Sequence, residues 1–318
     1  MFLRSWVSGV LILMIGGSAC IHISPQNTPP NNRDIKELIK LQTKRESIAW
    51  EMESTQEKNK KNPSEYEKKG DLLYKNGELG AALYQYVKAL SIDPKQERVL
   101  LKTGVICLKS ENFEGAVEVF NQALKLNAKQ ALAHEGRGSA WLAQNDLLKA
   151  EEDFNKAIAM QPNLWRSHNS LGVIYNRKGQ HKRAIDSYQK ALGIYPENIS
   201  LLNNLGYSYY LNGQYEQAVQ PLRTALSLYP NYRQAHNNLG LVYGMMGRYE
   251  ESLKEFKKGG EEAPAYNNIG YIYYLQGKYP EAIRYFNKAL ELRPSLYVTA
   301  HKNLKRAEEK QSQDRVNE

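Results

Sequence analysis

The sequence predicts an all-α fold, a solenoid of seven helix-turn-helix units followed by a C-terminal capping helix. Glycines recur every 34 residues from Gly70 to Gly240, and the next glycine of the series follows 30 residues later at Gly270. Two series of small residues, which begin at Ala82 and Ala89, keep the same register. A fixed period of this length is typical of repeat proteins, in which each unit buries its apolar face against its neighbours.

The composition excludes several other classes of protein. Hydrophobic residues make up 42% of the 318 residues, which is enough for a packed structure. Two cysteines are too few for a disulfide scaffold or for a zinc module based on cysteine. The net charge is +9, but the 43 basic residues are interleaved with 34 acidic residues. Because phosphate binding needs clustered basic residues, we expect no nucleic-acid partner.

Residues 1–19 resemble the signal peptide of a bacterial lipoprotein. The apolar run Trp6–Ile15 is too short to cross a bilayer, but it fits the apolar region of a secretory signal. Small residues then lead to Cys20, as in the lipobox, although Gly17 stands where leucine is usual. The resemblance implies lipidation of Cys20, and Ile21 after it implies sorting to the bacterial outer membrane, facing the periplasm. An uncleaved anchor and a secreted protein are the alternatives.

Residues 20–62 are expected to form a lipidated tether and an amphipathic helix. Prolines among polar residues predict an extended tether over residues 21–32. An apolar stripe then predicts one helix, with Leu38, Leu41, Ile48 and Met52 on one face. The stripe could seat the helix on the solenoid or pair it with a partner. Arg45 interrupts the stripe and favours seating on the solenoid.

Seven units are expected, followed by a capping helix and polar tail at residues 297–318. The units are 63–96, 97–130, 131–164, 165–198, 199–232, 233–262 and 263–296. Glycine or asparagine stands at most of the turns between paired helices, where a left-handed backbone is convenient, and Glu111 departs from this pattern. The sixth unit lacks four residues, so its second helix should be about one turn shorter. The capping helix should end near Lys310.

The units resemble the tetratricopeptide repeat over residues 63–296. The stretch from Asn203 to Tyr209 matches the first helix of that repeat almost residue for residue. The resemblance implies a right-handed superhelical solenoid of stacked antiparallel helix pairs, with a concave groove lined by the first helices.

We expect no catalytic residue, cofactor or metal site, and hence no enzyme activity. His134, His168 and His236 occupy the same position in their units, so they cannot converge on one metal ion, and we interpret them as packing residues. Cys107 occupies a position that tyrosine fills in later units, which indicates a buried structural thiol.

A partner-binding surface is predicted in the groove of the last four units. Side-chain amides there could offer one donor and one acceptor per unit to an extended peptide, from Asn169, Asn203, Asn204, Asn237, Asn238, Asn267 and Asn268. The same asparagines are also consensus residues of the repeat, which is the alternative. Tyrosine rings could act as rigid anchors, at Tyr207, Tyr210, Tyr271 and Tyr274.

The architecture resembles the lipoprotein of the Tad (Flp) pilus assembly system, and the tetratricopeptide-repeat pilotins of type IV pili. The resemblance implies a lipid-anchored periplasmic scaffold that binds a protein or peptide partner, such as a secretin, pilus or secretion component, and helps such a machine assemble. One alternative is an adaptor that recruits cell-wall synthases or hydrolases. Another is an accessory subunit of a separate enzyme.

Overall fold

The computed structural model describes residues 62–293 and 298–317, and all regular structure in these ranges is α-helical. The predicted all-α class is therefore confirmed for this part of the chain. The expected signal peptide, Cys20 and the expected helix of the tether lie outside the described residues. No helix within the described ranges is long and apolar enough to cross a membrane. The chain divides into two compact units, Met1–Pro94 and Lys95–Glu318.

The described part of the first unit is one helix pair. It consists of α2 (Pro63–Lys75) and α3 (Leu79–Ile92). The Asn62 side chain caps α2 by accepting a hydrogen bond from the backbone N–H of Ser64 at 3.0 Å. The buried Tyr86 of α3 donates its hydroxyl to Asp71 of α2 at 2.7 Å, so this pair carries both an aromatic contact and a polar one.

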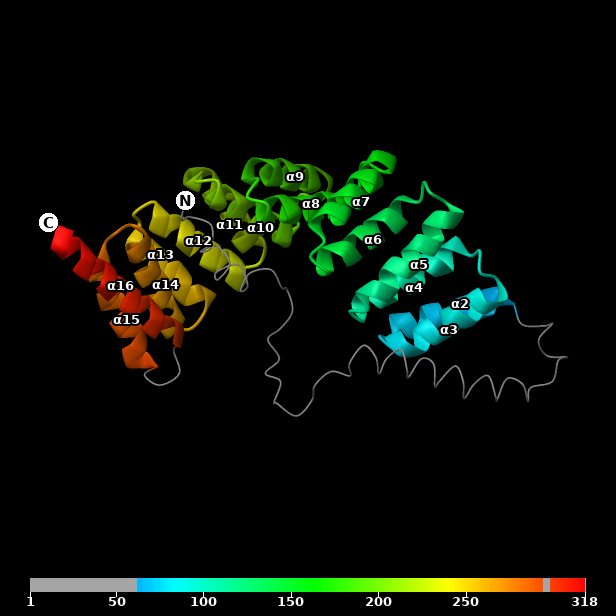
Figure 1. Cartoon of the computed structure of the whole chain (residues 1–318), viewed down its shortest axis with the longest axis horizontal. Coiled ribbons are helices and arrows are strands. Elements are labelled where there is room, and N and C mark those ends of the chain that lie inside the picture. The colour runs from blue at the N-terminus through cyan, green and yellow to red at the C-terminus, as the bar shows by residue number, and fades with distance from the viewer. Residues whose placement is uncertain (1–61, 294–297, 318) are drawn as a thin grey trace. The chain divides into compact units, whose positions relative to one another are not determined.

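The second unit continues the same pattern through six further pairs (Figure 1). The first helices of the pairs are α4 (Glu97–Lys109), α6 (Ala131–Ala143), α8 (Trp165–Arg177), α10 (Ile199–Leu211), α12 (Arg233–Met245) and α14 (Glu262–Leu275). The second helices are α5 (Phe113–Leu126), α7 (Leu147–Met160), α9 (His181–Ile194), α11 (Tyr215–Leu228), α13 (Tyr249–Gly259) and α15 (Tyr279–Leu292). The right-handed sense of the stack and the unit boundaries stay predictions.

Each pair is held by a close contact between a glycine of the first helix and a large side chain of the second. A Cβ at Gly206 would lie 2.5 Å from Leu222, and one at Gly172 would lie 2.6 Å from Tyr188. The other pairs repeat the contact, with Gly70–Tyr86, Gly104–Phe120, Gly138–Phe154, Gly240–Phe256 and Gly270–Phe286. Because a β-carbon at these positions would crowd the facing side chain, the glycine period sets how closely paired helices approach.

Histidines of the first helices tie successive pairs together. The Nε2 atom of His236 lies 2.8 Å from the carbonyl oxygen of Pro230, and its Nδ1 atom lies 2.6 Å from Glu255. The Nε2 atom of His134 lies 3.2 Å from the carbonyl oxygen of Ala128, and that of His168 lies 3.0 Å from the carbonyl oxygen of Pro162. Both are the equivalent contact to the end of the preceding pair. The packing role predicted for these histidines is confirmed. Within the described ranges, no group of histidine, cysteine and acidic residues could hold a metal ion.

The turn inside every pair uses one residue with a left-handed backbone. Five of these residues are glycines, at Gly77, Gly179, Gly213, Gly247 and Gly277. The other two are Glu111, with φ of 56°, and Asn145, with φ of 63°. Glu111 therefore differs in residue type from the glycines at the other turns but adopts the same left-handed backbone. The neighbouring helices hold it in a region that L residues disfavour.

The sixth pair absorbs the four-residue deletion at its end. Helix α13 has 11 residues, whereas the other second helices have 14, which confirms the predicted shortening. Only Gly260 and Glu261 connect α13 to α14, whereas four residues connect α11 to α12. The Gly240–Phe256 contact is kept. The deletion therefore alters the junction between two pairs and not the pair itself.

The C-terminal helix is longer than predicted. Helix α16 (Val298–Asn317) has 20 residues and does not end near Lys310. Its Ala300 and Ala307 are fully buried against the preceding pair, in a core cluster with Phe286 and Ala289 of α15. The helix extends because its polar residues continue the helical pattern without a glycine or proline that would end it.

The substitution Glu111→Gly should raise the free energy of unfolding of the full chain by about 1 kcal/mol, because a left-handed backbone costs an L residue about 1–2 kcal/mol. Asn145→Gly should give a smaller gain, since asparagine tolerates this conformation better. Denaturation by urea measures both. A loss of stability in Glu111→Gly would contradict the argument.

Two glycine substitutions should act in opposite directions. Gly206→Ala should destabilise the chain by about 1–3 kcal/mol, because its methyl group would overlap the Leu222 side chain. Gly193→Ala meets no atom within 4 Å and removes a helical glycine, so it should stabilise by about 0.5–1 kcal/mol. Thermal unfolding followed by circular dichroism compares the two, and equal shifts would show that the Gly206 contact does not limit packing.

Candidate partner-binding site

Two sets of tyrosines lie on the first helices of the fifth and seventh pairs. In the fifth, the rings of Tyr207 and Tyr210 stack with centroids 5.9 Å apart, and Tyr215 of α11 adds a third ring 6.0 Å from Tyr210. All three side chains are half-buried. Each ring is thus fixed by its neighbours and still reaches solvent.

The seventh pair repeats this arrangement. The rings of Tyr271 and Tyr274 stack with centroids 6.0 Å apart, and Tyr279 of α15 lies 5.7 Å from Tyr274. These side chains are also half-buried. The structure therefore brings each predicted tyrosine pair together and adds to each a third ring that the sequence analysis missed. That ring follows the turn glycine by two residues in both pairs.

The two sets lie close enough to influence each other electrostatically. Burial raises the pKa of the Tyr210 hydroxyl above its ordinary value, and Tyr207, Tyr215 and Tyr271 raise it further. Between the sets, α12 carries Gly244 at the position equivalent to Tyr210, so no ring intervenes at that position. We call the six rings the tyrosine surface, which comprises Tyr207, Tyr210, Tyr215, Tyr271, Tyr274 and Tyr279.

Most of the predicted asparagines bind one another. The side chain of Asn204 donates to Asn169 at 3.2 Å, and that of Asn238 donates to Asn203 at 2.8 Å. Each bond links one pair to the next, and we call this series of bonded asparagines the asparagine ladder. Asn203 and Asn238 are 8% and 2% exposed, so these carboxamides stabilise the stack and are not presented to a peptide.

The ladder of asparagines continues onto the C-terminal helix. Asn303 of α16 donates to Asn267 of α14 at 3.0 Å, and both side chains are buried. Helix α16 thus packs as the first helix of a further pair would. Asn203, Asn238 and Asn267 are buried, which does not fit the expectation that they offer their amides to a peptide. Asn169 and Asn204 are half-buried and each uses one polar atom in their mutual bond, so their role in binding stays a prediction.

Asn237 and Asn268 are the exception. They occupy the ladder positions on α12 and α14, but their side chains make no hydrogen bond within the described residues, and both are half-buried. Both line a pocket of about 170 Å³ at the junction of the sixth and seventh pairs. The pocket is also lined by Arg233, Phe256, Gly259, Gly260, Glu261, Pro264 and Arg293.

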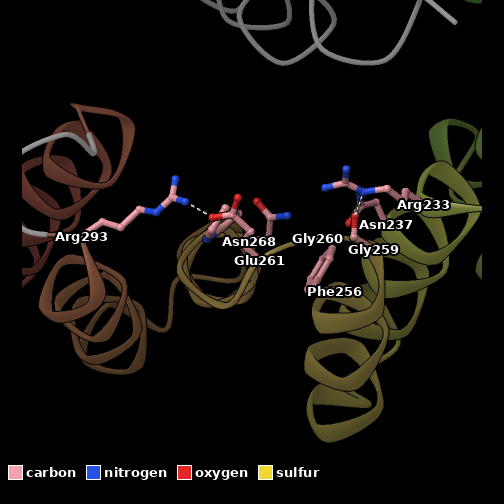
Figure 2. A pocket seen from close by; sticks show the side chains of 9 residues that line it. Arg233, Asn237, Phe256, Gly259, Gly260, Glu261, Asn268 and Arg293 are labelled. Atoms are coloured by element: carbon pink, nitrogen blue, oxygen red, sulfur yellow. Dashed lines mark hydrogen bonds and ion pairs between the residues drawn. The ribbon is translucent and has the colours of Figure 1, made fainter. Parts of the chain in front are cut away.

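Two arginines flank this pocket (Figure 2). Arg233 donates its Nε–H to the carbonyl oxygen of Gly259 at 3.0 Å, and its guanidinium extends from α12 towards α14. Arg293, from the end of α15, forms an ion pair with Glu261. Sequence analysis missed both arginines. The signal that could have found them is the four-residue deletion, which shortens the connection and draws these residues to one junction.

Comparison with known families agrees with this architecture. The model of the cilia and flagella-associated protein 70 C-terminal domain, a tetratricopeptide-repeat domain, matches residues 32–268, which is more than half of the chain. The chain belongs to this tetratricopeptide-repeat family. A second model, that of the tetratricopeptide repeat itself, matches residues 263–296 of this tetratricopeptide-repeat chain. No curated protein matches it.

Solved structures are similar to this tetratricopeptide-repeat chain in fold. A tetratricopeptide repeat protein from Parabacteroides merdae is 19% identical with a TM-score of 0.55, and the match covers 77% of this chain and 98% of that one. A chain of the APC/C hetero-tetramer Cut9–Hcn1 is 19% identical with a TM-score of 0.55, over 74% and 47% of the two chains. The MamA protein is 27% identical with a TM-score of 0.47, over 53% and 92%.

The asparagine ladder should contribute measurably to stability. Asn238→Ala leaves the buried Asn203 carboxamide without its donor, so it should cost about 1–3 kcal/mol. Asn268→Ala is the matched control, because it removes the same group where no hydrogen bond exists, and it should change stability by less than about 0.5 kcal/mol. Urea denaturation of both variants measures the difference. Equal costs would mean that the ladder adds nothing beyond side-chain packing.

Proposed function

We propose that this chain is a non-enzymatic scaffold that binds a protein or peptide partner on its tyrosine surface. Solenoids of stacked helix pairs present extended surfaces that other proteins use for binding. The tyrosine surface carries the proposal, because tyrosine contributes a large contact area with only two side-chain torsions to fix. Stacking within each set fixes these torsions before a partner arrives, which lowers the entropy lost on binding.

The chemistry of the surface favours a polypeptide partner. Six rings with hydroxyl groups combine apolar faces with polar edges, the combination that is enriched where proteins bind proteins. Tyrosine hydroxyls are protonated at neutral pH because their ordinary pKa is about 10, so the surface presents hydrogen-bond donors and no negative charge. Burial raises the pKa of Tyr210 further above that value. A surface of this kind suits a segment with apolar side chains and free backbone acceptors.

We further propose that the scaffold is anchored by lipid at Cys20 to the bacterial outer membrane, and that it faces the periplasm. In this proposal the partner is a secretin, pilus or secretion component, and the scaffold assists assembly of that machine. The lipobox-like residues before Cys20 and the resemblance to pilus assembly lipoproteins support it.

Labelling cells with an alkyne fatty acid should mark the chain, and Cys20→Ser should abolish the label; a labelled Cys20→Ser variant would contradict the anchor.

Replacing Tyr210 and Tyr274 together by leucine should weaken partner capture at least tenfold. Leucine is preferable to alanine, because both rings pack partly against the core clusters and an apolar side chain preserves those contacts. A photocrosslinking amino acid at position 207 of the full chain, introduced in the native cells, should give a product with a pilus or secretion component identified by mass spectrometry. The double variant should lose this product.

Tyr229→Leu is the matched control. Tyr229 is 52% exposed and follows α11, outside the tyrosine surface, so this variant should keep the crosslink. The melting temperatures of both variants should stay within a few degrees of the parent chain. An undiminished crosslink in the folded double variant would remove the tyrosine surface from the proposal.

A further inference from the structure

The junction between the sixth and seventh pairs is unlike the other junctions of the second unit. Its connection has two residues, whereas each of the other connections between helix pairs has four, and α13 ends at Gly259. The 170 Å³ pocket lies there. Pockets for whole cofactors and drug-sized ligands are about 300–1,000 Å³, so this pocket suits one or two residues of a polypeptide.

The junction lacks a rung of the asparagine ladder. Bonded asparagines of adjacent pairs are separated by 35 residues in sequence, as in Asn204 with Asn169 and Asn238 with Asn203. The deletion reduces the separation of Asn237 and Asn268 to 31, which is 268 minus 237, and these two make no hydrogen bond in the described part of the chain. Two carboxamides whose equivalents at other junctions bond each other are therefore available to a ligand.

Gly259 explains where the Asn237 side chain lies. Every other pair has a fully buried alanine at the position of Gly259, at Ala89, Ala123, Ala157, Ala191, Ala225 and Ala289. A Cβ at Gly259 would lie 2.3 Å from the Oδ1 atom of Asn237, so the glycine leaves the space that this carboxamide occupies. The Asn237 carboxamide can lie in the pocket only because residue 259 is glycine and not alanine.

The pocket also carries one uncompensated positive charge. Glu261 neutralises Arg293, but Arg233 meets no carboxylate within 4 Å in the described residues and bonds only the Gly259 carbonyl through its Nε–H. The terminal N–H groups of Arg233 remain available. A planar guanidinium binds a carboxylate through two parallel hydrogen bonds, which makes it selective for that group.

We propose that this pocket binds an acidic residue of an extended peptide segment. The carboxylate is held by the terminal N–H groups of Arg233, and the neighbouring peptide group takes the place of the missing rung between Asn237 and Asn268. A peptide group offers one donor and one acceptor, as a carboxamide does, so it can satisfy both asparagines. The inference rests on the proposed function, since it assigns part of the partner's sequence to one site beside the tyrosine surface.

A pair of matched probes tests the chemistry. One probe is a fluorescein-labelled, C-terminally amidated 12-residue peptide with glutamate at alternate positions among serine and tyrosine, and the other has glutamine in place of every glutamate. Fluorescence anisotropy with the full chain at physiological salt should show at least about tenfold tighter binding of the glutamate peptide, because charge-assisted hydrogen bonds exceed neutral ones. Equal affinity for the two probes would overturn the proposal.

Variants then locate the effect. Arg233→Gln should reduce the preference for the glutamate peptide to less than about twofold. Arg223→Gln removes the same charge from an exposed site on α11, outside the pocket, and should keep the preference. Because long-range attraction of the basic chain would respond equally to both substitutions, a similar loss in both variants would overturn the pocket as the site.

Gly259→Ala tests the contribution of the carboxamides. The new methyl group overlaps the position of Asn237 Oδ1, so the side chain must move and the affinity for both peptides should fall several-fold with the glutamate preference retained. Gly193→Ala is the control for the same change at an open helical site. Unaltered affinity in a folded Gly259→Ala variant would overturn the role of Asn237.

The same variants separate this inference from the proposed function. Arg233→Gln with a retained crosslink at position 207 and a retained glutamate preference overturns the pocket while the tyrosine surface stands. A glutamate preference that depends on Arg233, with no crosslink from the tyrosine surface, supports the pocket and overturns the proposed surface.

Discussion

The structure depends on one contact, the approach of a large side chain to a helical glycine sixteen residues earlier in the same pair. From Gly70–Tyr86 to Gly270–Phe286 the spacing never varies, although the units themselves differ in length. A β-carbon at any of these glycines would lie 3.2 Å or less from its partner side chain, closer than ordinary van der Waals contact. The geometry within each pair is therefore constant. A deletion such as the one in the sixth unit changes the connection between pairs instead.

This constraint decides what a deletion can do. Removing four residues before Phe256 would have broken its contact with Gly240, but the loss falls after Phe256 and leaves the pair intact. The deletion instead alters the junction, where α14 follows α13 after two residues and Asn237 and Asn268 do not bond each other. The small residue at Gly259 and the flanking Arg233 then belong to a site that regular spacing would have closed. An irregularity in an otherwise uniform array thus has a specific chemical consequence.

The sequence predicted the helices well because their determinants are local and periodic. The helical glycines, the turn residues and the histidines His134, His168 and His236 all make contacts that recur at the same position in their units. The hydrogen-bond partners of the asparagines were not predictable in the same way, since they depend on which side chain faces the neighbouring pair. Sequence spacing showed that the asparagines share a face, but Asn203 and Asn238 turn out to face each other. The length of α16 was missed because its alanines are few and widely spaced among polar residues.

Uniform stacking also explains why one incomplete junction can persist. In a linear array of pairs, each contacts only its neighbours, so stability is close to a sum over junctions and a weak one lowers the total without unfolding the rest. The junction of α13 and α14 lacks an asparagine bond of the kind that Asn204 makes with Asn169 and Asn238 makes with Asn203. The carboxamides of Asn237 and Asn268 are half-buried and make no hydrogen bond within the described residues, so a ligand can bond them without first breaking a contact within the chain. At the bonded junctions a ligand would first have to break the hydrogen bond between two asparagines, and this is the physical difference that the deletion makes.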